Sequence, residues 1–316
     1  MTHPLDDLSI PTTAQRGRAL LHGSNIGVPE VLLLLVAAVW GGSYAVTKQV
    51  TLQWPVLDFL ILRFGLTFLV LLPALRPLFT AQWRGGLAVG AILGVNLLGI
   101  FLCETYGVTR TSAANAALLI SLCVALTPLA EWWLLGRAPT ARVWQAVALS
   151  VIGAGLSSAS SGFGRPGLGD ALILLAALLR AIMVTQTRRL ATRHKLPALT
   201  LTALQTAVVT LGLVALALAM RGPHWPVALP QQASFWGGMA FLVLLCTVFA
   251  FFAQNFAASR TSPSRVSLLM GSEPAFGVLF AVVWLGERLT PLGCLGGVLM
   301  VLAAWYAARA PAVSPA

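Results

Sequence analysis

The sequence has few charged residues and few cysteines. Only 9% of its 316 residues are Asp, Glu, Lys or Arg, whereas soluble domains carry about 25%. Hydrophobic residues make up 58%, which excludes a disordered chain, because such chains lack the apolar residues that fill a core. Four cysteines in a chain of this length exclude a small disulfide scaffold. An integral membrane protein is the class that remains.

Motifs for ATP hydrolysis, metal binding and nucleophilic catalysis are also missing. The sequence contains no Gly-x-x-x-x-Gly-Lys-Ser/Thr loop that would bind a nucleotide phosphate. The cysteines lie far apart without metal-ligand spacing, and the histidines fall in the N-terminal tail or in predicted loops. We therefore expect no cofactor and no enzymatic activity. The net charge of +11 comes from scattered single basic residues, so nucleic acid is not an expected partner.

Apolar runs at regular spacing predict ten transmembrane helices. A spanning helix needs about 20 apolar residues, and in lipid a helix satisfies all of its own backbone hydrogen bonds. The breaks between runs contain proline, glycine or charged residues, which favour turns. The predicted spans are 29–49, 56–75, 85–106, 113–135, 142–160, 168–187, 198–220, 234–256, 265–285 and 291–308.

The distribution of basic residues predicts the orientation of the chain. With the N-terminus inside, 13 of the 20 Lys and Arg residues fall on the inner side, 5 on the outer side and 2 within spans. An excess of Lys and Arg marks the cytoplasmic side of a membrane protein. We therefore expect cytoplasmic tails at 1–28 and 310–316. The expected location is the cell membrane, which is the inner membrane in a Gram-negative cell.

The two halves of the chain resemble each other. A shift of 150 residues places Arg110-Thr111-Ser112 on Arg260-Thr261-Ser262, and at the start of each half a shift of 140 places Lys48 on Arg188. Each half has five predicted spans, an odd number, so the second copy is inverted relative to the first. Inverted repeats are typical of secondary transporters, in which two similar halves provide states open to alternate sides. The fold class we expect is therefore all-α and membrane-integral, with ten helices in two inverted five-helix repeats.

Several motifs carry a resemblance to a known family. They are Trp40-Gly41, Leu62-Arg63-Phe64, Thr111 to Leu119, Ser272-Glu273-Pro274, and Leu285 to Thr290. These motifs resemble those of the drug/metabolite transporter superfamily, and in particular its EamA-type ten-helix permeases. The resemblance implies a first repeat at 29–160, a second at 168–309, and the transport of a small molecule with a bias toward export. Arg137 and Arg180 depart from the family pattern, so the bulkier substrate classes of the family are not assumed.

Charged residues within the predicted spans are candidates for a solute site. A charge at the membrane centre costs about 2.5–3.5 kcal/mol, and both Arg180 and Glu273 fall near the middle of a predicted span. The two side chains either neutralise each other or line a central cavity. In a cavity, the Arg fork suits a carboxylate and the Glu suits an ammonium group or carries a proton. The residues expected to bind substrate are Trp40, Tyr44, Asn115, Arg180, Gln254 and Glu273.

Other charges near the spans have simpler interpretations. We expect Glu104 to reach water or to pair with Arg110, and Arg63 to form a structural ion pair. Pro128 and Pro274 lie inside predicted spans, where each removes a backbone hydrogen bond and bends the helix.

Arginine and glutamate together suit a zwitterion. We therefore expect a secondary transporter that exports amino acids or related small metabolites by alternating access, with protons as a candidate coupling ion. A sugar, a nucleoside or a cationic drug stays open as an alternative cargo. The expected partners are a small-molecule substrate and membrane lipid. Both a monomer and a homodimer stay open.

Overall fold

The computed structural model describes residues 27–79, 83–111, 116, 119–159, 167–194, 196–222, 228–277, 280 and 291–308. All regular secondary structure in these residues is helical, as the long apolar runs predict. Six helical runs in the described part of the chain are long and apolar enough to cross a membrane, and shorter apolar helices accompany them.

The helices follow the predicted spans closely. In the first half they are α2 (Val28–Gln53), α3 (Val56–Leu71), the 3-10 helix η1 (Leu72–Phe79), α4 (Trp83–Val108), α6 (Cys123–Leu135) and α7 (Ala141–Ala159). In the second half they are α8 (Leu168–His194), α9 (Ala198–Arg221), α10 (Ala233–Ala240), the π-helical segment η3 (Phe241–Phe249), α11 (Ala250–Ala258), α12 (Pro263–Met270) and α14 (Pro291–Ala308). The helical segments α10, η3 and α11 follow one another directly and together fill the predicted eighth span.

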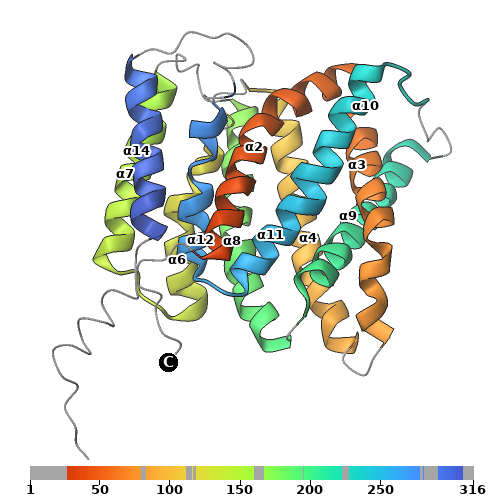
Figure 1. Cartoon of the computed structure of the whole chain (residues 1–316). Coiled ribbons are helices and arrows are strands. Elements are labelled where there is room, and N and C mark those ends of the chain that lie inside the picture. The colour runs from red at the N-terminus through yellow and green to blue at the C-terminus, as the bar shows by residue number, and fades with distance from the viewer. Residues whose placement is uncertain are drawn as a thin grey trace, which may run out of the picture.

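Helices α7 and α14 lie side by side at one edge of the molecule (Figure 1). Their backbones are in close contact, because a Cβ atom added at Gly153 of α7 would lie 2.7 Å from the carbonyl oxygen of Gly296. Helices in lipid associate through small residues of this kind. The helices α2, α8, α11 and α12 lie between this pair and the opposite edge, where α3 and α9 are found (Figure 1).

Glycines also bring α4 against α9. A Cβ atom added at Gly90 would lie 2.5 Å from the side chain of Leu204, and one added at Gly94 would lie 2.6 Å from Val208. These two glycines therefore serve helix contact within one molecule.

The predicted fourth and ninth spans are both interrupted. A turn at Leu122 comes just before α6, and a turn at 271–272 follows α12 before helical residues resume. Under the shift of 150 residues, Leu122 is equivalent to Ser272, so the two interruptions occupy matching places in the repeats. Both turns lie on the N-terminal side of the prolines at which bends are expected: Pro274 follows the end of α12 by four residues, and Pro128 lies inside α6.

The turns that follow α4 and α11 have the same structure. The backbone N–H groups of Arg110-Thr111 donate to the carbonyl of Gly107 at 2.9 and 3.0 Å, and those of Arg260-Thr261 donate to the carbonyl of Ala257 at 2.9 Å each. The likeness of the two halves in sequence is therefore also a likeness in backbone structure.

Candidate functional site

A cavity lies among α2, α3, α4 and α8, beside the residues that follow the break in the ninth span. Its lining includes Trp40 and Tyr44 from α2, Arg180 from α8, and Glu273. The space open to water molecules is about 20 Å³, which is room for one or two waters. The lining side chains must therefore separate before a larger solute can enter.

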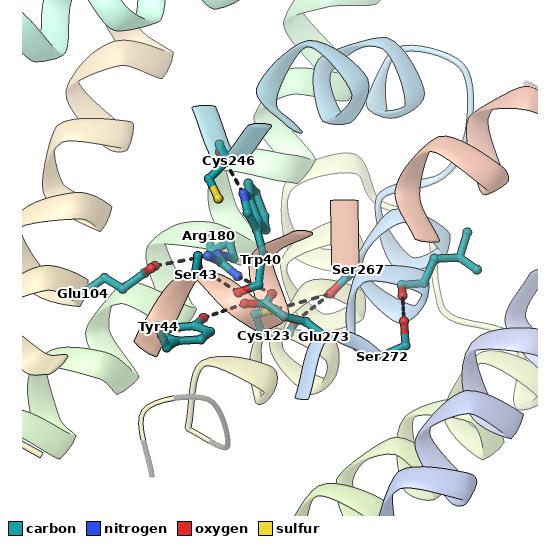
Figure 2. A network of polar contacts seen from close by, with 11 residues as sticks. Trp40, Ser43, Tyr44, Glu104, Cys123, Arg180, Cys246, Ser267, Ser272 and Glu273 are labelled. Atoms are coloured by element: carbon teal, nitrogen blue, oxygen red, sulfur yellow. Dashed lines mark hydrogen bonds and ion pairs between the residues drawn. The ribbon is translucent and has the colours of Figure 1, made fainter. Parts of the chain in front are cut away.

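Arg180 lies between two carboxylates in this cavity (Figure 2). Its Nη1 is 3.2 Å from Oε2 of Glu273, and its Nη2 is 3.1 Å from Oε2 of Glu104. Arg180 is 8% exposed and Glu273 is 3% exposed. The two residues therefore pair with each other, and both also line the cavity.

Residues of α2 hold the charged cluster of Arg180, Glu104 and Glu273 in place. The hydroxyl of Tyr44 donates a hydrogen bond of 2.6 Å to Oε1 of Glu273. The guanidinium carbon of Arg180 lies 4.8 Å from the centre of the Trp40 ring, which is the geometry of a cation–π contact. Both side chains on α2 that the sequence singled out thus contact the charged cluster.

The indole of Trp40 is fixed in turn by the π-helical segment. Its Nε1 donates to the backbone carbonyl of Cys246 at 2.8 Å. Within η3 the hydrogen-bonding pattern is shifted by one residue relative to an α-helix, and π-helical segments occur frequently at functional sites. The next residue, Thr247, donates to the carbonyl of Leu242 at 2.7 Å.

Arg63 also lines the cavity, and sequence reasoning assigned it a different role. It is 4% exposed, and its Nε donates to the hydroxyl of Thr247 at 2.9 Å. Its guanidinium carbon lies 4.9 Å from the centre of the Phe101 ring. The expected ion pair is not found, because Arg63 is paired with no carboxylate in the described part of the chain. The signal in the sequence was the charge itself, inside an apolar span.

Glu104 was a second residue that the sequence left out of the site. It does not pair with Arg110, as one expectation had it, but with Arg180. Arg110 instead donates to the carbonyl of Tyr106 at 3.1 Å and lies over that ring.

Of the two remaining predicted site residues, Gln254 is not among the residues that line the cavity in the described part of the chain. Asn115 lies outside the described residues. Gln254 is 2% exposed, and its side-chain oxygen and nitrogen both lack hydrogen-bond partners among the described residues. Its neighbour Asn255 donates to Thr202 at 2.9 Å and to Gln205 at 2.7 Å. Gln254 is therefore buried within α11, apart from the cavity lining.

Equivalent residues of the two halves touch each other beside the cavity. Trp40 and Arg180 are equivalent under the shift of 140, and they form the cation–π contact. Phe101 and Phe251 are equivalent under the shift of 150, and their ring centres are 5.8 Å apart. Residues that contact their own equivalents lie on the axis relating two copies, so the cavity lies at the axis between the repeats.

No group of three or more His, Cys, Asp or Glu side chains in the described residues could hold a metal ion. The chemistry that the cavity offers is that of two guanidinium and two carboxylate groups, an indole and a phenol.

Both halves of the chain match one protein family. The EamA-like transporter family is matched at residues 28–159 and again at 167–309. The chain belongs to the EamA-like transporter family. It is therefore a multi-pass membrane transporter with two EamA domains, and not an enzyme, as the sequence motifs implied.

Two proteins of Archaeoglobus fulgidus, each named an uncharacterized transporter, are similar over most of this EamA chain. One is 28% identical over 298 residues, which cover 86% of this chain and 82% of the relative. The other is 27% identical over 289 residues, covering 86% and 94%. A solved crystal structure superimposes with a TM-score of 0.68 at 19% identity, covering 90% of this chain and 98% of that one. The last likeness concerns the fold alone.

Proposed function

We propose that this EamA-family protein exports amino acids or related small metabolites across the cell membrane by alternating access. The observation that carries the proposal is the charged cavity at the axis between the repeats. Arg180 shares its single positive charge between Glu104 and Glu273, so this cluster has an excess of negative charge when both carboxylates are ionised. An ammonium group of a substrate compensates that excess.

The charges of the cavity also favour a small zwitterion over the alternative cargoes. A cationic drug is expected to prefer Glu273 without a nearby arginine, but Arg180 lies against it. A sugar needs no cluster of buried charges. These cargoes nevertheless stay as the alternatives that the experiment must test.

Contacts at the two ends of the repeats support alternating access. At one end, Lys48 donates to the carbonyl of Thr111 at 3.4 Å, and the Thr111 hydroxyl donates to Asp170 at 2.6 Å. At the other end, Arg188 donates to the carbonyl of Ser259. Lys48 and Arg188 are equivalent under the shift of 140. Equivalent basic residues thus donate to the turns that follow α4 and α11.

The orientation and the coupling ion belong to the same proposal. The excess of Lys and Arg residues on one side supports both termini in the cytoplasm. Two carboxylates on one guanidinium support proton coupling, because one of them can take up a proton while the other keeps the pair with Arg180.

Flux measurements in proteoliposomes test the proposal. Radiolabelled leucine, phenylalanine and threonine are supplied with and without a pH gradient, and a sugar, a nucleoside and a cationic dye are supplied in parallel. We expect amino-acid flux that responds to the gradient. Glu273→Gln should lose that response, because glutamine carries no proton. Glu131→Gln should keep it and is the matched control, since Glu131 is a buried glutamate that instead contacts Ser264.

Two results would contradict parts of the proposal separately. Flux of the sugar, nucleoside or dye without amino-acid flux would refute the substrate class. Amino-acid flux that ignores the pH gradient would refute proton coupling alone.

A further inference from the structure

We infer that Arg63, and not Arg180, binds the carboxylate of the transported solute. This inference rests on the proposed function and names the residue that recognises one end of the substrate. It assigns Arg180 the separate role of holding Glu104 and Glu273 in place.

Arg180 has no free side of its fork to offer. One terminal nitrogen pairs with Glu273 and the other with Glu104, at 3.2 and 3.1 Å. The face of the guanidinium lies against the Trp40 ring. A substrate carboxylate at Arg180 would have to displace a buried glutamate, which would then be left unpaired at a large cost in free energy.

Arg63 is the opposite case. It is as deeply buried as Arg180 and lines the same cavity. Its Nε donates to the Thr247 hydroxyl. Neither terminal nitrogen of Arg63 has a hydrogen bond or an ion pair in the described part of the chain. Buried charges in proteins are normally paired. An unpaired guanidinium beside a cavity therefore indicates that its partner is an anion from outside the protein.

The surroundings of Arg63 orient its fork. Thr247 accepts from Nε and donates its own proton to the carbonyl of Leu242, so its hydroxyl can only be an acceptor toward Arg63. The Phe101 ring supports the guanidinium at 4.9 Å. Thr247 binds Nε and Phe101 covers one face of the guanidinium. The terminal N–H groups are therefore left for a bidentate contact, which is the geometry that a carboxylate favours.

The position of Glu104 completes the site for a zwitterion. Glu104 follows Phe101 by three residues on α4, so the two side chains lie on the same face of that helix, with Cβ atoms about 5–6 Å apart. The Arg63 guanidinium lies over the Phe101 ring, so it is a neighbour of the Glu104 carboxylate on the cavity wall. An amino acid can place its carboxylate on Arg63 and its ammonium group on the cluster of Glu104 and Glu273.

The test compares each amino acid with its carboxamide, in which the carboxylate becomes a neutral amide. The probes are leucine with leucinamide and phenylalanine with phenylalaninamide, with butyrate and butyramide as a pair that lacks the ammonium group. Binding to the purified full chain is measured in detergent. We expect the wild type to prefer each acid over its amide.

Arg63→Gln should lower the affinity for the acids about 10- to 100-fold and leave the affinity for the amides unchanged. Arg63→Lys keeps the charge without the fork and should be intermediate. Arg180→Gln should weaken acids and amides alike, because it disturbs the carboxylates that receive the ammonium group. Thermal stability without ligand is a second measurement. Arg63→Gln should lower it less than Arg180→Gln, because only the second variant leaves Glu104 and Glu273 without the cation that pairs with them.

Failure of this inference can be told apart from failure of the proposed function. If Arg63→Gln keeps the wild-type preference for acids, or if Arg180→Gln is the variant that abolishes it, the inference is overturned. If the wild type binds no amino acid but binds butyrate in a way that depends on Arg63, the proposed substrate is wrong and the role of Arg63 stands. If it binds neither, both are overturned.

Discussion

Replacing Gly41 by alanine tests whether the close approach of α2 to the residues after α12 positions Glu273. A Cβ atom at residue 41 would lie 2.7 Å from the backbone nitrogen of Gly277 and 2.8 Å from the carbonyl oxygen of Glu273. Because both are backbone atoms, no side-chain rotation can relieve the contact. Ordinary contacts begin at 3.4 Å, so α2 and this segment must separate by about 0.7 Å.

That separation acts directly on the charged cluster. The hydrogen bond from Tyr44 on α2 to Glu273 is 2.6 Å long, and such bonds are about 2.5–3.0 Å when well formed. An increase of about 0.7 Å takes it beyond that range. We therefore expect Gly41→Ala to loosen the hold of α2 on Glu273 and to slow transport.

The adjacent Gly42 provides a matched control. A Cβ atom there would meet the Phe280 ring at 3.7 Å, which is ordinary contact. Both substitutions replace a glycine within α2, so both share the gain in helix stability of about 0.5–1 kcal/mol. The difference between the two variants is therefore the cost of overpacking alone, about 1–3 kcal/mol.

Unfolding in detergent measures the stability difference, and flux in proteoliposomes measures transport. Gly41→Ala should be the less stable of the two variants by that amount and the slower transporter. Equal stability of the two variants would refute the reasoning about backbone contact. A stability difference with unchanged flux would show that this contact does not position the cluster.

Two further predictions concern contacts outside the cavity. Glu131 accepts hydrogen bonds from the backbone N–H of Ser264, at 3.0 Å, and from the Ser264 hydroxyl. Glu131→Ala should therefore lower the free energy of unfolding, measured in detergent, by about 1–3 kcal/mol. Glu131→Gln should lower it by less. Gly153→Ala should destabilise the protein through the contact with Gly296 on α14 but leave substrate binding intact. Gly155→Ala is the control and should change neither stability nor binding, because no atom of the described residues lies within 4 Å of the added carbon. Thermal shift with and without leucine measures both effects.

The positions of the helices could be predicted from the sequence because long apolar runs and their breaks decide them. The repeat could be found from Arg110-Thr111 and Arg260-Thr261, since these residues form the same turn in both halves. The pairing of Arg180 with Glu273 was one of two alternatives. The cost of burying a charge indicates that partners exist but does not say which ones, so Glu104 was missed.

The interruptions of the helices were only partly predictable. Pro274 lacks the N–H that would bond to the carbonyl of Met270, and α12 ends at Met270. No proline explains the turn at Leu122, whose place follows from equivalence with the second repeat. The π-helical segment Phe241–Phe249 contains neither proline nor glycine. Trp40 and Arg63, which are far away in the sequence, donate hydrogen bonds to this segment. Local sequence patterns do not contain such long-range contacts, so they could not predict the π-helical segment.

The repeats share their backbone features but not their charges, and this difference gives a physical reading of Gln254. Gln254 is equivalent to Glu104 under the shift of 150, yet Glu104 lines the cavity while Gln254 is buried with both amide atoms unpaired. In alternating access the inverted halves exchange their arrangements, so a residue buried in one state has its equivalent at the cavity. On the proposed mechanism we expect Gln254 to approach the solute in the state open to the other side, where its amide atoms would gain partners. Its assignment to substrate binding stays a prediction.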